Sequence, residues 1–203
     1  MGLKRCWQED YLEAGVDEAG RGCLAGPVVA AAVILPDSFT LPLLDDSKKL
    51  SASQRAALRP EIERKAMAYH VAFVDNHEID RINILQASVR AMHLALEGLN
   101  VSPEHVLVDG NYFIPWRFIP YRTVVKGDGK YMNIAAASIL AKTYRDDYMI
   151  QLHDRFPHYS WDTNMGYPTS LHREGIRRYG TTSFHRMSFD LLGEKKKVLH
   201  DKG

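Results

Sequence analysis

Two adjacent carboxylates, Asp17 and Glu18, end an apolar run near the N-terminus and are followed closely by Gly20, Arg21 and Gly22. Carboxylate oxygens are the ligands that hard divalent cations such as Mg²⁺ prefer, whereas glycines beside an arginine let amides and a guanidinium approach an anion. The stretch therefore indicates half of a metal site beside half of a phosphate-binding site. Neither half is specific alone.

Two further carboxylates, Asp109 and Asp128, each follow a short apolar run that reads as a strand. Ligand sites in α/β sheets lie beyond strand ends, and two-metal phosphodiester hydrolysis needs several acidic oxygens around ions about 4 Å apart. Taken singly, each acid is more often a cap or a solvated turn residue. Taken together with Asp17 and Glu18, they favour metal-assisted hydrolysis.

The pair at Asp17 and Glu18 poses a geometric difficulty for a regular strand. Adjacent strand residues point to opposite faces of a sheet, so both side chains could not serve one metal pair. Gly15, Gly20 and Gly22 tolerate irregular backbone. We therefore expect the strand to break or bulge at Glu18.

The elements that must position these residues follow from hydrophobic periodicity. Strands are predicted up to residues 17–18 and over 26–35, 70–74, 105–109 and 121–126, the first two forming a hairpin. Helices are predicted over 51–66, with a disturbance at Pro60, and over 83–99, 131–156 and 170–179. This order predicts an α/β fold with a central mixed five-stranded sheet flanked by helices and a small C-terminal helical extension. Residues 1–192 are expected to form one domain and 193–203 a frayed basic tail.

Bulk composition is that of an ordinary globular domain. The chain has 203 residues, of which 45% are hydrophobic, and 26 basic against 25 acidic residues give a net charge of +1, so overall charge offers no case for nucleic acid. Two cysteines, Cys6 and Cys23, make no disulfide framework or zinc pattern. Without a signal peptide or an apolar run of about 20 residues, a cytoplasmic monomer that has no contact with a membrane is expected.

Several motifs in order along the chain resemble ribonuclease HII, over roughly residues 13–189. They are 15–22 (GVDEAGRG), 24–31 (LAGPVVAA), 46–50 (DSKKL), 108–110 (VDG), 126–128 (KGD), 135–142 (AAASILAK) and 166–169 (GYPT) with His172. The first motif is highly specific, and one departure is Cys23, where the family usually has proline. A small buried residue should be tolerated there.

The resemblance implies a ribonuclease H-like fold and an endonuclease acting on the RNA of RNA–DNA hybrids and on single ribonucleotides in duplex DNA. It implies cleavage 5′ of the ribonucleotide, leaving a 5′-phosphate and a 3′-hydroxyl, in removal of misincorporated ribonucleotides and RNA primers during DNA replication and repair. Mg²⁺ or Mn²⁺ would bind the four acids. The implied site residues are Asp17, Glu18, Asp109 and Asp128 for metal and catalysis, and Gly20, Arg21, Gly22, Lys48, Lys142, Tyr167 and His172 for nucleic acid.

The residues agree with this interpretation on physical grounds. An enzyme that separates RNA from DNA must sense the 2′-hydroxyl, which donates and accepts hydrogen bonds, and the amides and carbonyls of a glycine loop can do both. Two other hypotheses remain: a non-catalytic nucleic-acid-binding module with structural acids, and a phosphotransfer enzyme on small substrates. The second predicts a glycine- and lysine-rich phosphate loop, which the sequence lacks.

Overall fold

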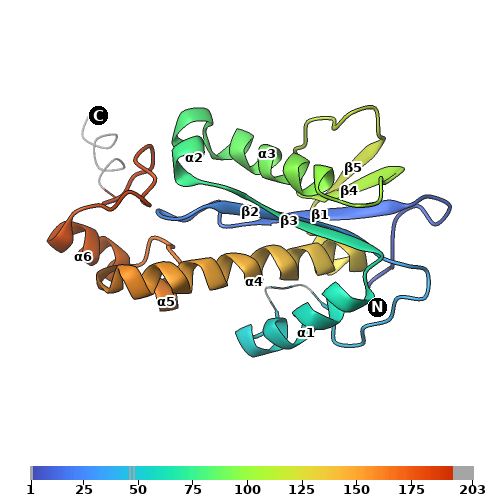
Figure 1. The fold of residues 1–203 in the computed structure, drawn as a ribbon, viewed down its shortest axis with the longest axis horizontal. Helices are drawn as coiled ribbons and strands as arrows, with labels where there is room; N and C mark the ends of the chain where they lie inside the picture. Colours follow the sequence, from blue (N-terminus) through green and yellow to red (C-terminus); the bar gives the residue numbers. More distant parts are fainter. Residues whose placement is uncertain (1, 46, 48, 194–203) are drawn as a thin grey trace, which may run out of the picture.

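The fold is built on one five-stranded sheet with the order β3-β2-β1-β4-β5 (Figure 1). The computed structural model describes residues 2–45, 47 and 49–193. The first three strands form an antiparallel meander, whereas β4 runs parallel to β1 and β5 parallel to β4. The strands are β1 (Glu13–Ala19), β2 (Val28–Ile34), β3 (Ala68–Val74), β4 (His105–Asp109) and β5 (Tyr121–Val124). The predicted mixed sheet and the hairpin are thus confirmed.

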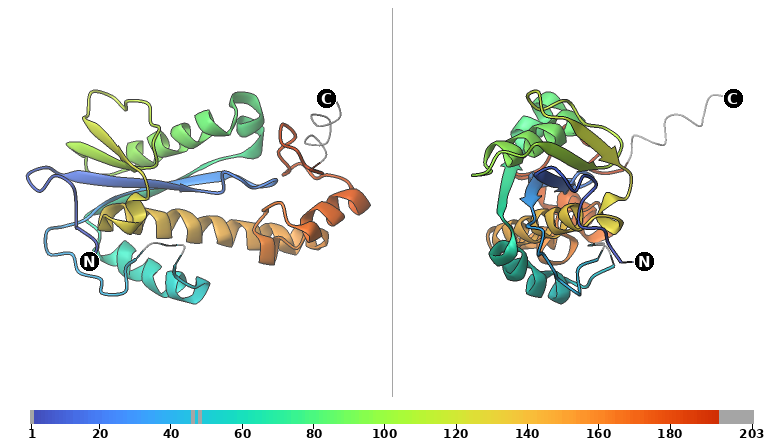
Figure 2. Two further views of the ribbon diagram at one scale, coloured as in Figure 1. Left: turned by 180° about the vertical axis from the view of Figure 1, so that it is seen from behind. Right: turned by 90° about the vertical axis from the view of Figure 1, so that its right-hand side faces the viewer.

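Helices cover both faces of the sheet, as the views in Figures 1 and 2 show. One face packs on α3 and the other on α4 with α1, and each forms its own hydrophobic core. A smaller cluster lies at the end of α4, where the C-terminal helices gather. The helices are α1 (Ala52–Lys65), α2 (Asn76–Ile82), α3 (Ile84–Glu97), α4 (Met132–Arg155), α5 (Trp161–Asn164) and α6 (Ser170–Tyr179), with 3₁₀ turns η1 (Gly127–Gly129) and η2 (Pro157–Tyr159).

Helix starts follow the capping chemistry of the sequence. Ser51 caps α1 in a reciprocal arrangement with Gln54, and the Asn83 side chain accepts from the first amides of α3. Pro60 does not end α1, which continues to Lys65. A short helix that was not predicted, α2, is capped by Asp75. None of the helices in the described ranges has the length and apolar character needed to cross a bilayer.

Strand β1 stays regular through both of its carboxylates, so the predicted break at Glu18 is wrong. Glu18 pairs with Ala30 and Ala19 with Val29 in unbroken antiparallel register. Valine and alanine side chains on β2 are fully buried on both faces, which keeps the two strands in step through the end of β1. Asp17 and Glu18 therefore point to opposite faces of the sheet.

The start of α4 lies directly against β1. A Cβ placed on Gly15 would overlap the backbone of Asn133, so only glycine permits this approach. The next residues of the helix, 135–137, are fully buried alanines. This close packing brings the polar side chains farther along α4 beside the end of β1.

Candidate active site

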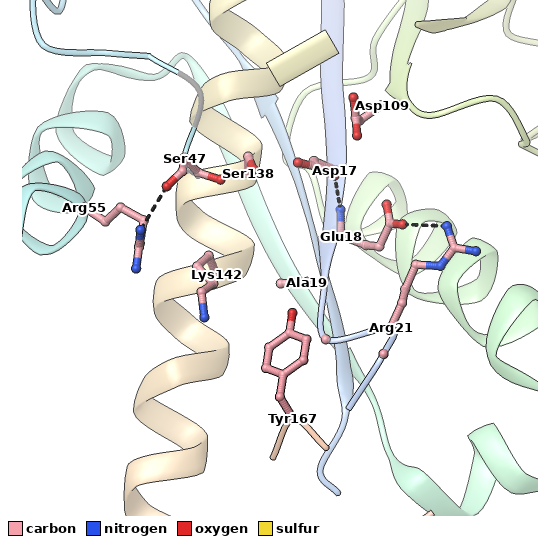
Figure 3. Close-up of a pocket in the computed structure, with 12 residues that line it drawn as sticks. Asp17, Glu18, Ala19, Arg21, Ser47, Arg55, Asp109, Ser138, Lys142 and Tyr167 are labelled. Carbon is pink, nitrogen blue, oxygen red and sulfur yellow. Dashed lines mark hydrogen bonds and ion pairs between the residues drawn. The ribbon is translucent and has the colours of Figure 1, made fainter. Parts of the chain in front are cut away.

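A cavity of about 290 Å³ opens at the end of β1, between that strand and α4 (Figure 3). Three of the predicted acids, Asp17, Glu18 and Asp109, line it. The predicted substrate-contacting residues Gly20, Arg21, Gly22, Lys142 and Tyr167 also line it. Residues as far as 150 positions apart along the chain, Asp17 and Tyr167, therefore lie around one space.

The three acids meet because the neighbouring strand stops early. The parallel pairing of β1 with β4 ends at Val16 and Val108, so β1 has a free edge beyond that point. Asp109 follows Val108 as the last residue of β4. Side chains from both faces of β1 can reach round this free edge. Asp17 and Glu18 can therefore approach one site without the predicted bulge.

The acids are poorly satisfied in the free protein. Burial, reinforced by the charges of Glu18 and Asp109, raises the pKa of Asp17 well above its ordinary value, although Ser138 opposes this by a hydrogen bond. Burial also raises the pKa of Glu18 against the opposing charge of Arg21, whose Nη1 lies 3.1 Å from Glu18 Oε1. The other carboxylate oxygen, Oε2, is buried and has no hydrogen-bond partner in the described part of the chain.

This donor set fits a divalent cation that keeps part of its shell for water and substrate. A buried, unpartnered carboxylate oxygen and mutually repelling acids are relieved by positive charge. Within residues 2–45, 47 and 49–193, no three or more His, Cys, Asp or Glu side chains form a preassembled metal cluster. Mg²⁺ takes few protein ligands and completes its shell with substrate phosphate and water, so an open arrangement suits it.

Asp128 does not line the cavity. It is fully buried in the η1 turn directly behind Asp109, and its Oδ1 accepts from the Gly129 amide at 3.1 Å. The adjoining Gly127 amide donates to Asp109 Oδ1 at 2.6 Å. The turn that carries Asp128 thus fixes the orientation of Asp109.

The 20–22 loop faces the cavity with unused backbone donors. Gly20 has φ +93°, a conformation that favours glycine, and it turns the chain away from β1. The amides of Arg21 and Gly22 have no acceptor among the described residues. Tyr167, which is 41% exposed, packs beside Gly22 with its hydroxyl near the Cys23 thiol.

Two buried arginines support this loop from behind. Arg145 of α4 donates to the carbonyls of Ala25, Pro27 and Met165 at 3.2, 3.0 and 2.8 Å. Arg186, which no sequence motif marked, is fully buried and donates to the Arg21 carbonyl. No short motif marks a supporting arginine, because its role depends on the carbonyls that the fold brings to it.

Four further residues line the cavity without having been singled out as site residues: Ala19, Ser47, Arg55 and Ser138. The hydroxyls of Ser47 and Ser138 lie 2.8 Å apart, and Arg55 Nη1 donates to the Ser47 carbonyl at 2.9 Å. Both serines belong to motifs quoted above, which was the available signal. Lys142 Nζ lies 2.6 Å from Asp146 Oδ1 on the same helix.

Two predicted nucleic-acid residues are not seen at the cavity. Lys48 lies outside the described residues. His172 is fully buried and does not line the cavity, which corrects the prediction that it contacts nucleic acid. Its Nδ1 lies 3.0 Å from the Tyr167 carbonyl, so it contacts the backbone of a lining residue instead.

Known proteins resemble this chain over nearly its full length. A family model described as Ribonuclease HII matches residues 14–192. The Ribonuclease HII of Bacteroides thetaiotaomicron is 60% identical over 92% of this chain and 93% of its own length. That of Parabacteroides distasonis is 61% identical over 91% of this chain and 92% of its own.

Solved structures share the fold. Ribonuclease H2 from Pyrococcus horikoshii OT3 superposes with a TM-score of 0.73 at 28% identity, covering 89% of this chain and 94% of that one. RNase HII from Archaeoglobus fulgidus, solved in a complex with PCNA, has a TM-score of 0.73 at 29% identity over 88% and 95%. The fold is therefore the ribonuclease H-like fold, and this chain belongs to the ribonuclease HII family of hydrolases, endoribonucleases that act on RNA–DNA hybrids.

Proposed function

We propose that this protein nicks duplex DNA on the 5′ side of an embedded ribonucleotide and cuts the RNA strand of hybrids in the same cavity. One observation carries the proposal: the carboxylates Asp17, Glu18 and Asp109 share a cavity with the 20–22 loop and Tyr167. Chemistry and sugar recognition are therefore adjacent. In the cell, the protein acts in the cytoplasm as a monomer and removes misincorporated ribonucleotides and RNA primers.

Mg²⁺ or Mn²⁺ is the proposed cofactor, held by Asp17, Glu18, Asp109 and Asp128. When bound, such ions lower the pKa of water and stabilise charge on the phosphate. The unpartnered oxygen of Glu18 and the raised pKa of Asp17 support this role. For Asp128 the support is indirect, since its turn holds Asp109 in place through the Gly127 amide.

The protein's own groups bind and orient the nucleic acid. The free amides of Arg21 and Gly22 are donors for the 2′-hydroxyl or a neighbouring phosphate, and loop carbonyls accept. The ring of Tyr167 packs against the sugar that follows. Lys142 and Lys48 contact phosphates, as sequence-independent positioning contacts do.

The reaction balances as a hydrolysis. Water attacks the phosphorus on the 5′ side of the ribonucleotide, and the bond from phosphorus to the upstream 3′-oxygen breaks. The 3′-oxygen leaves with a proton as a 3′-hydroxyl, and the ribonucleotide keeps a 5′-phosphate. The carboxylates set the direction of attack by fixing where the water and the phosphate lie.

The test uses a duplex DNA that contains one ribonucleotide, incubated with Mg²⁺, Mn²⁺ or a chelator. We expect one nick on the 5′ side of the ribonucleotide. The nick should require metal and leave a 3′-hydroxyl and a 5′-phosphate. An all-DNA duplex of the same sequence is the control. Absence of the nick with every divalent metal would overturn the proposal, even if hybrids are cut.

A further inference from the structure

The segment of residues 182–186, which follows α6, lies along the back of the loop that leaves β1. Ala25 and His185 form an antiparallel bridge. The Gly26 amide donates to the Phe184 carbonyl at 2.9 Å, and the Arg186 amide donates to the Leu24 carbonyl at 2.8 Å. The 182–186 segment thus adds a short strand-like support to the loop, beside the contacts that Arg145 of α4 makes with it.

The guanidinium of Arg186 binds three carbonyls of that loop. Nη1 donates to Arg21 at 3.0 Å, Nε to Gly26 at 2.9 Å and Nη2 to Pro27 at 3.0 Å. The side chain is fully buried, and no described carboxylate lies within ion-pair distance of it. Burial lowers its pKa to about 10, so it keeps its charge at neutral pH. A planar fork of donors suits carbonyls that diverge in this way.

The neighbouring residue, His185, begins a directed hydrogen-bond chain that ends at Tyr167. The Thr182 amide donates to His185 Nδ1 at 2.9 Å, so the proton of this ring is on Nε2. His185 Nε2 lies 3.2 Å from His172 Nε2 and donates to it.

The indole nitrogen of Trp161 donates to the same His172 Nε2 at 3.0 Å. With two donors directed at Nε2, the proton of His172 must be on Nδ1. Nδ1 then donates to the Tyr167 carbonyl at 3.0 Å. Both rings are buried and neutral, and each has one arrangement of protons that satisfies every partner.

We infer that Arg186 and His172 are positioning residues for ribonucleotide recognition, and that the 182–186 segment sets the spacing between the 20–22 loop and Tyr167. Arg186 holds the Arg21 carbonyl, and its neighbour His185 holds Tyr167 through His172. The Leu24 amide, which donates to the Gly166 carbonyl at 2.7 Å, closes the ring. The inference rests on the proposed function of the loop and Tyr167 as the sugar-reading pair.

The two substrate types should respond differently to a loss of this spacing. A single ribonucleotide in DNA offers one 2′-hydroxyl in one register, so a small displacement of the loop removes recognition. A hybrid offers a 2′-hydroxyl at every position of its RNA strand, and a displaced loop can still find one. Misplacement by about 1 Å can cost on the order of 100-fold in rate.

The experiment compares Arg186→Lys with Arg173→Lys. Arg173 is a matched control, since its Nη1 also donates to two backbone carbonyls, of Asp190 and Leu191, away from the cavity. For Arg186→Lys we expect kcat/KM on the single-ribonucleotide duplex to fall by about 10- to 100-fold more than on a hybrid. For Arg173→Lys the two substrates should change equally. A folded Arg186→Lys protein with an unchanged substrate ratio would overturn the inference.

A second pair of variants covers the case in which Arg186→Lys does not fold. His172→Asn keeps a nitrogen donor near the position of Nδ1, whereas His172→Phe removes it. The measured quantity is kcat/KM on the single-ribonucleotide duplex divided by kcat/KM on a hybrid. We expect this ratio to fall in His172→Phe and to fall less in His172→Asn. Equal ratios in the two variants would contradict the role of the Tyr167 carbonyl contact.

Hydrogen exchange of the free protein separates this inference from the proposed function. The hydrogen-bonded amides of Cys23, Leu24 and Gly26 should exchange faster in Arg186→Lys than in the wild type, and Arg173→Lys should leave them unchanged. If the wild type fails to nick the duplex, the proposed function is wrong while the exchange result still tests the support. If the wild type nicks and exchange is unaltered by Arg186→Lys, the support itself is refuted.

Discussion

The carboxylates at the free edge of β1 and the guanidiniums behind the 20–22 loop are both buried charges, but they are satisfied in opposite ways. Among the described residues, one buried oxygen of Glu18 has no hydrogen-bond partner, and burial together with neighbouring acids raises the pKa of Asp17. Arg145 and Arg186 each donate to three backbone carbonyls. The carboxylates can therefore gain interactions from a bound ligand, whereas the guanidiniums already have their hydrogen-bond partners within the protein.

The difference explains why each group lies where it does. An incomplete set of acids gains stability from a bound cation and a phosphate, so it belongs on the cavity wall. A complete set of donors fixes backbone and gains nothing from substrate, so it belongs behind the loop. Variants of the acids should therefore change activity with little loss of stability, and variants of the support should change both.

The largest expected effect on activity comes from Asp109→Asn. We expect the rate of nicking to fall by about 1,000-fold or more, because a ligand and a charge are lost where phosphate charge must be stabilised. The melting temperature should stay level or rise, since one of the repelling charges around Asp17 is removed. Asp154→Asn, an exposed acid on α4, is the control. A rate within a few-fold of wild type would mean that Asp109 is not a metal ligand.

The largest expected effect on stability comes from Gly20→Ala. A Cβ at this position would overlap the Arg145 guanidinium, and φ is +93°. Strain and the displaced hydrogen bonds should cost about 3–5 kcal/mol of unfolding free energy and most of the activity. Gly180→Ala is the matched control, because φ is +76° there and no atom lies within 4 Å of the added Cβ. Denaturant unfolding measures the free energy of unfolding of both variants. Equal losses in the two variants would show that the Arg145 side chain moves aside at little cost.

Acid should weaken the support behind the loop through protonation of His185. Burial, with a smaller electrostatic contribution from the neighbouring His172 ring, lowers the pKa of His185 from 6.5 to about 4. The unfolded chain therefore binds an additional proton between these values, so this contribution to stability is full above about pH 6.5 and decreases as the pH falls to about 4. The loss should reach roughly 3 kcal/mol. The rings of Tyr159, Trp161 and His172 face His185.

Comparison with His185→Gln isolates this contribution, because other acids also destabilise the fold at low pH. The variant should be less stable at pH 7, and the gap to the wild type should narrow toward pH 4. Urea unfolding at several pH values measures the gap. A gap that stays constant over this range would show that His185 is not buried as a neutral ring.

The smallest expected effect comes from Lys142→Gln. Lys142 lies on the cavity wall but is paired with Asp146 in the free protein, so substrate must compete with an existing ion pair. We expect KM to rise by about 3- to 10-fold with kcat little changed, and the salt dependence of binding to fall by about one phosphate contact. Lys130→Gln, an exposed lysine that donates to the Val125 carbonyl, is the control. An unchanged salt slope would remove Lys142 from the phosphate contacts.

Most of the sheet and the acidic edge could be predicted from the sequence. The apolar runs predicted all five strands, and α6 begins and ends at the predicted residues, 170 and 179. Asp17, Glu18 and Asp109 meet because each lies near a strand end, which is a local property of the chain. The predicted strand break at Glu18 was wrong because the prediction rested on β1 alone. The free edge of β1 depends instead on where β4 ends.

The support behind the loop could not be predicted in the same way. An arginine in a sequence looks solvated or phosphate-binding, and nothing in the sequence around Arg145 indicates that its side chain is buried. Its burial depends on carbonyls from residues 25, 27 and 165, which come together only in the folded chain. His172 was likewise assigned to the substrate, although the rings of Trp161 and His185 enclose it.

The late position of Arg186 has a consequence for synthesis of the protein. The ribosome releases the three cavity acids, Lys142 and Tyr167 before it releases Arg186, which is the residue that holds the Arg21 carbonyl. A nascent chain can therefore assemble its sheet and its acidic edge while the loop that selects the sugar still lacks its support. If the loop reads the sugar as proposed, selective cleavage becomes available only after Arg186 has been made.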